Sequence, residues 1–318
     1  MEKIPVIAIV GPTGVGKTDL SIRLAKKLNG EIVSCDSMQI YREMDIGTAK
    51  PTKEEMMGIP HHMIDIVNPD ESYNVDKYVD NSSKCIKDVF SRGNIPILAG
   101  GTGLYADSLL GGISFVKTKG DEEYRKYLFD LAEKEGNEYV HKMLETIDPV
   151  SFNAIHPNNV RRVVRALEVY KCTGNTITYH NEMSKKEPSP YNPLIFGLTR
   201  HRDELYERID KRVDIMVEKG LVKEAENLYN KGYTTDLTSM QGLGYKEFIK
   251  YFEGEISLSE AIEILKRDTR HYAKRQLTWF NRNKDIVWIN LSEMTDDEAF
   301  DFALEKSLEH LNNTCKKM

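Results

Sequence analysis

The sequence predicts an α/β protein of the P-loop NTPase-like class, a parallel sheet with helices on both faces and a helical insertion domain. Short apolar segments alternate with helical patterns over most of the chain. Residues 11–18 form a glycine-rich motif directly after the first apolar segment. Strand patterns disappear between about residues 115 and 193, where helical spacing continues.

The expected strands are short and apolar, which is typical of a parallel sheet covered on both faces. They are Ile4–Val10, Glu31–Ser34, His62–Val67, Ile95–Ala99, Leu194–Leu198 and Ile286–Leu291. Helical spacing between them predicts Lys17–Leu28, Val75–Ser91, Leu104–Leu109, Arg202–Lys219, Leu221–Lys231 and Leu258–Arg282. Residues 1–114 and 194–318 therefore form the expected core.

The expected insertion domain covers residues 115–193. Apolar residues follow helical spacing from Tyr124 to Ala132 and again from Val160 to Leu167. The loop Lys117–Gly120 and the sequence Pro188-Ser189-Pro190 bound the segment. We expect this insertion to contribute to macromolecular binding, because it carries a basic cluster described below.

The composition is that of an ordinary globular protein. The 318 residues are 40% hydrophobic and 30% charged, with a net charge of −6, which argues weakly against a nucleic-acid coat protein. No apolar run approaches the roughly 20 residues that span a bilayer, and no signal peptide is visible, so we expect a cytoplasmic protein. The cysteines are widely separated and indicate neither a zinc site nor a disulfide framework.

The motif at residues 11–18 fits a phosphate-binding loop at every fixed position. Its backbone N–H groups and the positive end of the following helix can bind phosphate oxygens, and a chance glycine-rich turn is the alternative. The lysine adds a positive charge, and the threonine can ligate Mg²⁺. The motif predicts binding of a di- or triphosphate and consists of Gly11, Pro12, Thr13, Gly14, Val15, Gly16, Lys17 and Thr18.

Two further segments follow strands of the expected sheet. Asp36 lies after the second strand, where it is either a general base or a Mg²⁺ ligand through water, or the N-cap of a helix over Ser37–Tyr41. The fourth strand ends in Gly100–Gly103, where glycines would let a ligand approach the backbone and Thr102 could donate a hydrogen bond. A plain strand-to-helix turn is the alternative.

Three groups of basic residues are candidates for binding anionic partners. Arg208 and Arg212 lie one helical turn apart and suggest a diphosphate clamp, although a solvated face is the alternative. Between Lys266 and Lys284, seven Lys or Arg residues accompany a single acid, which favours a rail for a phosphate backbone over a membrane-surface helix. Arg161, Arg162 and Arg165 form a weaker patch, for which an ion pair with Glu168 is the alternative.

The pair His61-His62 could suggest a metal site. No third ligand occurs at a suitable spacing, so we interpret the pair as the entry to a strand.

Taken together, these motifs resemble the bacterial tRNA dimethylallyltransferases over roughly residues 4–290. The matching blocks are Gly11–Thr18, Asp36-Ser-Met-Gln-Ile-Tyr41, Met44-Asp-Ile-Gly-Thr-Ala-Lys-Pro51, Pro60-His-His62 with Asp65, Gly100-Gly-Thr-Gly-Leu-Tyr105, His156-Pro-Asn158, Arg165-Ala-Leu-Glu-Val169, Gly242-Leu-Gly-Tyr245 and Lys274-Arg-Gln-Leu-Thr-Trp-Phe280. That family transfers a dimethylallyl group from its diphosphate to the exocyclic N6 amine of the adenosine just 3′ of the anticodon, in tRNAs that read codons starting with U. The resemblance implies a monomer that requires Mg²⁺ on Thr18.

The resemblance also implies roles for individual residues. The residues of the phosphate loop and Arg208 would bind the diphosphate of dimethylallyl diphosphate, Asp36 would take the amine proton, and Thr102 would support it. The residues implied in tRNA contact are Asp36, Ser37, Met38, Gln39, Thr102, Arg161, Arg162, Val163, Val164, Arg165, Gln241, Gly242, Leu243, Gly244, Tyr245, Lys246, Lys274, Arg275, Gln276, Leu277, Thr278, Trp279, Phe280 and Asn281. Many relatives carry Arg-Arg where this chain has Asn281-Arg282.

The same residues leave rival functions open. A P-loop small-molecule kinase would share the phosphate loop, and a prenyltransferase acting on free adenylates would share the loop and Asp36. A non-catalytic, nucleotide-dependent RNA-binding switch is the third alternative. Of these rivals, the prenyltransferase acting on free adenylates would not need the basic rail.

Overall fold

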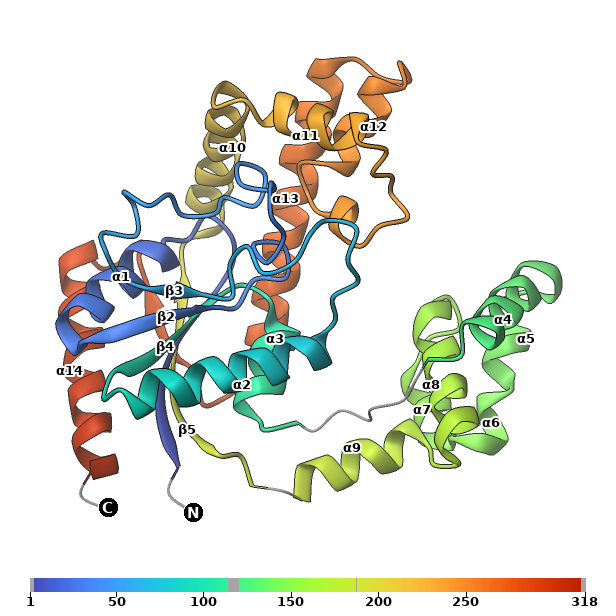
Figure 1. Ribbon diagram of the computed structural model, residues 1–318, viewed down its shortest axis with the longest axis horizontal. Coiled ribbons are helices and arrows are strands. Elements are labelled where there is room, and N and C mark those ends of the chain that lie inside the picture. Colours follow the sequence, from blue (N-terminus) through green and yellow to red (C-terminus); the bar gives the residue numbers. More distant parts are fainter. Residues whose placement is uncertain (1–2, 114–119, 187, 316–318) are drawn as a thin grey trace. The chain divides into compact units, whose positions relative to one another are not determined.

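The computed structural model describes residues 3–113, 120–186 and 188–315 (Figure 1). The chain divides into two compact units, residues 1–110 with 190–318, and residues 111–189. The sequence analysis set the corresponding boundaries at residues 114 and 194. Of the expected bounding loop Lys117–Gly120, residues 117–119 lie outside the described part.

The first unit is built on one parallel sheet with the strand order β3-β2-β4-β1-β5-β6. Ile7 of β1 lies opposite Ile97 of β4 on one side and Leu194 of β5 on the other. The carboxyl ends of β2, β4 and β1 are therefore neighbours, as are the loops that follow them. The strands are β1 (Ile4–Val10), β2 (Gly30–Ser34), β3 (His61–His62), β4 (Ile95–Gly100), β5 (Tyr191–Thr199) and β6 (Val287–Asn290).

Both faces of this sheet are buried, which explains its uninterrupted apolar strands. In β1, Val6 and Ala8 belong to one hydrophobic core and Ile7 and Ile9 to the other. Helices α1 (Lys17–Leu28) and α14 (Asp296–Cys315) pack on the second of these faces (Figure 1). The first face contacts α2 (Val75–Ser91) and α3 (Gly103–Leu110).

The remaining helices of this unit pack against the first core. They are α10 (Arg202–Glu218), α11 (Leu221–Asn230), the 3₁₀ turn Ser239–Gln241, α12 (Lys246–Phe252) and α13 (Leu258–Phe280). α10 and α13 also contribute residues to the second core. α13 begins with a capping box in which Ser257 and Glu260 bind each other's backbone N–H groups. No helix in the described ranges is long and apolar enough to cross a membrane.

The predicted α/β class is confirmed, but the third strand was predicted wrongly. It occupies only His61–His62, not His62–Val67. Met63 and Asp65 have φ values of 64° and 55°, so the backbone leaves the extended conformation there. Val67 regains a single bridge, to Tyr41, which places residues 41 and 67 side by side.

The second unit is helical. Its core contains Leu128, Val140, Leu144, Val164 and Leu167. The helices are α4 (Glu122–Glu135), α5 (Asn137–Lys142), α6 (Leu144–Ile147), α7 (Pro149–Ala154), α8 (Val160–Thr173) and α9 (Ile177–Lys186).

A buried carboxylate joins α4 to α8 within this unit. Glu168 is completely buried and accepts hydrogen bonds from Arg125 and Arg165 at 2.6 and 2.8 Å. Burial alone would raise the pKa of Glu168, but the bonds from Arg165 and Arg125 outweigh it and lower the pKa. The ion-pair alternative for Arg165 is therefore the one that the structure contains.

Candidate active site

The phosphate loop follows β1 at the carboxyl edge of the sheet. Gly11, Gly14 and Gly16 have φ values of 147°, 78° and 119°, a region that side chains disfavour. A Cβ on Gly11 would also lie 2.6 Å from the carbonyl oxygen of Leu198 on β5. Gly16 is the N-cap of α1 and provides no side-chain cap, so the first N–H groups of α1 remain available to an anion.

Cations from two helices surround this loop. Lys17 donates a hydrogen bond from Nζ to the carbonyl of Pro12 at 2.7 Å. Burial and the Arg212 cation lower the pKa of Lys17 to about 8, against the opposing effect of Asp36. From α10, Arg208 donates from Nε to the carbonyl of Gly14 at 3.1 Å.

Arg212 is a site residue to which the sequence analysis gave no role beyond the clamp hypothesis. Burial lowers the pKa of Arg212, and the largest opposing influence is the negative charge of Asp36. The structure therefore brings Arg212, Lys17 and Asp36 within electrostatic reach of one another. The one-turn spacing from Arg208 was the available signal, and it did not distinguish a solvated arginine from one turned toward the loop.

Asp36 follows β2 and caps a turn rather than a helix. Its Oδ1 accepts hydrogen bonds from the backbone N–H groups of Met38 at 2.8 Å and Gln39 at 3.4 Å. Residues 37–40 form bends and turns and Tyr41 lies in a bridge, so the helix expected under the N-cap alternative is absent from this described segment. The backbone bonds fix one carboxylate oxygen toward the turn and leave the other for a ligand.

Thr102 supports this turn from the neighbouring strand. Its Oγ1 accepts a hydrogen bond from the N–H of Ser37 at 3.0 Å, and its own N–H donates to the carbonyl of Cys35 at 3.1 Å. These bonds join the loop after β4 to the loop after β2 on either side of Asp36. Thr102 thus positions the turn that carries the carboxylate.

Glycine is required before and after Thr102 for a reason other than the expected approach of a ligand. A Cβ on Gly100 would lie 2.0 Å from the carbonyl oxygen of Cys35. One on Gly101 would lie 2.2 Å from Nε2 of Gln276, and one on Gly103 would lie 2.2 Å from the ring of Trp279. The close approach at each hypothetical Cβ is made by the chain's own β2 loop and α13, and the approach of a ligand to these glycines stays a prediction.

Helix α13 lies over these loops with one stripe of its surface. Gln276 accepts from the N–H of Thr13 at 2.9 Å and donates to the carbonyl of Gly101 at 2.8 Å. One turn later, Trp279 donates from Nε1 to Asp107 at 2.7 Å. One turn earlier, Tyr272 bonds Thr102; burial and Asp36 raise the pKa of this tyrosine.

This stripe corrects part of the expected tRNA surface. Gln276 is only 5% exposed and Phe280 only 2% exposed, so neither side chain is available to a macromolecule. Tyr272, one turn before Gln276, faces the Asp36 turn. The helical period explains the correction, because buried and exposed positions alternate within the block 274–280.

The basic rail on α13 is shorter than predicted. Arg270 binds both oxygens of Asp210 at 2.5 and 2.7 Å, and Lys266 pairs with Asp214 at 2.7 Å. These acids come from α10, so the sequence of α13 alone did not reveal them. Lys274 and Arg275 are exposed and have no carboxylate within ion-pair distance among the described residues.

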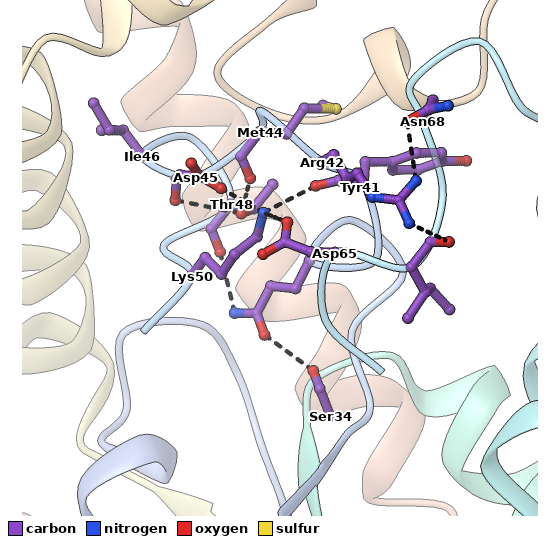
Figure 2. A network of polar contacts seen from close by, with 12 residues as sticks. Ser34, Tyr41, Arg42, Met44, Asp45, Ile46, Thr48, Lys50, Asp65 and Asn68 are labelled. Carbon is purple, nitrogen blue, oxygen red and sulfur yellow. Dashed lines mark hydrogen bonds and ion pairs between the residues drawn. The ribbon is translucent and has the colours of Figure 1, made fainter. Parts of the chain in front are cut away.

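The segment 39–51 is held by a network around one buried lysine (Figure 2). Lys50 donates to Asp45 and Asp65, each at 2.5 Å, and to the carbonyl of Tyr41 at 2.9 Å. Its side chain is 5% exposed, so this cation has exchanged water for these oxygens. Figure 2 shows Asp45 and Asp65 on either side of the ammonium group. The block Met44–Pro51 is therefore a folded support for the Asp36 turn.

The same block is tied to α11 and to the 242–245 turn. Glu224 accepts hydrogen bonds from the N–H groups of residues 45–47 at 2.8 to 3.0 Å and from Tyr245 Oη at 2.7 Å. A Cβ on Gly47 would lie 2.6 Å from the ring of Tyr245. Gly242, Gly244 and Tyr245 are buried, so the expectation that these three residues contact tRNA was wrong.

The side chain of Gln39 also makes hydrogen bonds within the protein. Its Oε1 accepts from Ser34 Oγ at 3.0 Å, and its Nε2 donates to the carbonyls of Thr48 and Ala49 at 3.3 Å each. The polar atoms of this side chain are thus occupied within the protein. Ser37 and Met38 remain half-buried at the tip of the same turn.

In the second unit, the segment 161–165 on α8 contains both buried and exposed residues. Val163 and Val164 are 1% and 2% exposed in the helical core, so the expectation that they contact tRNA was wrong. Arg161 and Arg162 are exposed on the same helix. The prediction assigned a continuous run, while a helix turns its residues by 100° each and buries two of the five.

The His61-His62 pair contributes to a polar cluster at the start of β3. His62 bonds Glu31 at 2.6 Å, and Glu31 also accepts from Arg92 and Asn94. Burial opposes the charge of Glu31, but these hydrogen bonds outweigh it and lower the pKa of Glu31 to about 2. No group of three or more His, Cys, Asp or Glu residues in the described ranges could hold a metal ion.

The chain is similar to known proteins along nearly its whole length. The sequence model of the family described as IPP transferase matches residues 39–283, and that of isopentenyl transferase matches residues 4–68. The tRNA dimethylallyltransferase of Acetivibrio thermocellus is 53% identical over 92% of this chain and 94% of its own. That of Lachnoclostridium phytofermentans is 51% identical over 93% and 94%, respectively.

Solved structures agree with this similarity. The tRNA isopentenylpyrophosphate transferase of Bacillus halodurans is 46% identical, with a TM-score of 0.75 over 99% of both chains. A eukaryotic dimethylallyltransferase acting on tRNA is 33% identical, with a TM-score of 0.85 over 98% of this chain and 80% of its own. The phosphate loop, the Asp36 turn and α13 lie within these aligned lengths. The chain belongs to the IPP transferase family.

Proposed function

We propose that this protein transfers a dimethylallyl group from dimethylallyl diphosphate to the N6 amine of the adenosine 3′ of the anticodon in tRNAs that read codons starting with U. The observation that carries the proposal is the convergence of the phosphate loop, its two arginines and the Asp36 carboxylate at one edge of the sheet. The reaction needs cations and N–H groups to bind the donor diphosphate, and a carboxylate beside them to take the proton of the acceptor amine. The curated relatives that bear the name tRNA dimethylallyltransferase support the same activity.

The reaction forms a bond between N6 of adenine and C1 of the dimethylallyl group, and breaks the bond between C1 and the bridging oxygen. Diphosphate leaves with the bonding electrons, and the N6 proton passes to Asp36. The N–H groups of the phosphate loop, Lys17 and Arg208 would stabilise the charge that grows on the leaving oxygens. Proton removal by a positioned carboxylate is typically worth about 10²–10⁴-fold in rate.

A divalent cation is expected for a prenyl transferase of this family, and we propose Mg²⁺. Thr18 is exposed in the first turn of α1 and could offer its hydroxyl. Mg²⁺ usually keeps several waters and binds one or two protein groups together with phosphate oxygens, which suits a site with few protein ligands. When bound, the cation would neutralise part of the leaving-group charge.

The exposed cations supply candidate contacts to tRNA. In the first unit these are Lys274 and Arg275, and in the second unit Arg161 and Arg162. The exposed or half-buried positions Ser37, Met38, Gln241, Leu243, Lys246, Leu277, Thr278, Trp279 and Asn281 remain candidates as well. As the resemblance to the family implies, we propose that the protein acts as a monomer. With tRNA as the acceptor, we expect the reaction in the cytoplasm.

The test is incubation of the protein with labelled dimethylallyl diphosphate, Mg²⁺ and unmodified tRNA that reads codons starting with U. We expect label in the tRNA and release of diphosphate. AMP, ADP and ATP replace tRNA in parallel reactions, and transfer to these alone would favour the adenylate prenyltransferase. Consumption of ATP without tRNA would favour the kinase.

Asp36→Asn distinguishes catalysis from binding. This variant keeps the size of the side chain and an acceptor for the turn, and should bind tRNA normally while losing at least about 100-fold in transfer rate. Normal transfer by Asp36→Asn would exclude the proposed base.

A further inference from the structure

The last turns of α13 connect the donor loop to the loop of the proposed reaction centre through one side chain. Gln276 accepts a hydrogen bond from the N–H of Thr13 at 2.9 Å and donates one from its amide nitrogen to the carbonyl of Gly101 at 2.8 Å. Thr13 belongs to the phosphate loop after β1, and Gly101 precedes Thr102 after β4.

The fit around this side chain is close. Gln276 is 5% exposed, and a methyl group on Gly101 would lie 2.2 Å from its Nε2. The amide has both a donor and an acceptor, and each faces a backbone group of the opposite kind. A glutamate would keep the acceptor and lose the donor, and a methionine of similar length would lose both.

The same helix carries exposed cations next to this buried amide. Lys274 and Arg275 precede Gln276 directly and are exposed, and no described carboxylate pairs with them. One helix therefore contains the exposed charges proposed for tRNA and the buried contact to the donor loop.

We infer that Gln276 is a positioning residue that sets the distance between the diphosphate-binding loop and the Asp36–Thr102 loops, and that it does not contact tRNA. The catalytic part of this inference rests on the proposed function. Its direct consequence concerns the donor: without the amide, the phosphate loop loses its support at Thr13, and donor binding and turnover suffer. Acceptor affinity stays the same.

The experiment compares Gln276→Met and Gln276→Glu with the wild type in steady-state transfer, varying donor and tRNA separately. We expect Gln276→Met to lower kcat/KM for the donor at least about tenfold, because two buried backbone groups lose their partners. The KM for tRNA should stay within about twofold. Gln276→Glu should fall between Gln276→Met and the wild type, because it retains the acceptor for Thr13.

Two further variants on α13 serve as controls. Thr269→Val removes a half-buried hydroxyl that bonds only the carbonyl of Leu265 within the helix, and should leave both constants unchanged. Lys274→Glu should give the reverse pattern, a raised KM for tRNA with an unchanged KM for the donor. A raised tRNA KM in Gln276→Met, with donor constants unchanged, would overturn the inference and return Gln276 to the tRNA surface.

A binding measurement separates this inference from the proposed activity. Calorimetric titration with inorganic pyrophosphate and Mg²⁺, without tRNA, should show weaker binding by at least about tenfold in both Gln276 variants than in Thr269→Val. Equal affinities would refute the positioning role even if transfer to tRNA is observed. Weaker binding in a protein that modifies no tRNA would uphold the role and reject the proposed function.

Discussion

Lys17 should make donor use fall as the pH rises through about 8. Burial and Arg212 hold the pKa of Lys17 at about 8, well below its ordinary value of 10.5. With that value, about nine-tenths of the side chain is charged at pH 7 and about one-tenth at pH 9. Because only the ammonium form stabilises the diphosphate, kcat/KM for the donor should drop about ninefold over this range.

The assay is transfer of labelled dimethylallyl to saturating tRNA at constant ionic strength, between pH 6 and 10. Lys17→Arg tests the cause, because arginine stays charged throughout this range. Its activity should be lower, since the guanidinium does not fit the same position, but its profile should be flat above pH 7. Lys26→Arg, on the exposed face of the same helix, should retain the wild-type profile.

The reasoning would be refuted by a wild-type profile that is flat to pH 10. It would also be refuted if Lys17→Arg and the wild type declined in parallel, because the titrating group would then lie elsewhere.

Three other predictions concern stability and the rail. The pKa of Glu31 is about 2, against an ordinary value of 4.5, so its charge stabilises the fold by about 3 kcal/mol above pH 4.5. This stabilisation is lost as the pH falls toward 2. In chemical denaturation at each pH, the free energy of unfolding should therefore fall less on acidification in Glu31→Gln than in the wild type. Gly103→Ala should lower Tm by about 3–10 °C in calorimetry, because its methyl group would overlap Trp279; an unchanged Tm would contradict that packing. Arg270→Gln should leave the KM for tRNA within about twofold, because Asp210 already neutralises this cation, and a large rise in filter-binding or kinetic assays would restore the longer rail.

Local patterns predicted most of the sheet and its helices. The limits of α1 and α2 were predicted correctly to the residue, because each carries an uninterrupted apolar stripe. The phosphate loop was recognisable because its chemistry depends on consecutive residues. The third strand failed because left-handed backbone at Met63 and Asp65 has no signal in apolar periodicity.

The parts of the site that could not be predicted depend on partners far away in the sequence. The acid that neutralises Arg270 lies 60 residues earlier, on α10, and the glutamine that explains Gly101 lies 175 residues later. A resemblance to a family assigns a role to a whole block of consecutive residues. In a helix, however, some residues of such a block are buried and others are exposed. Val163 shows the result, since it lies beside exposed arginines yet belongs to the core.

The contact between Gly47 and Tyr245 has a consequence for how relatives of this protein can vary. The ring occupies the space that any side chain at position 47 would need, while its hydroxyl shares Glu224 with the backbone of that loop. A larger residue at 47 would be tolerated only together with a smaller one at 245, and Glu224 would then lose the hydrogen bond from Tyr245 and keep those from the backbone. Across homologous chains these positions should change as a group or remain the same, although nearly 200 residues of sequence separate the first from the last.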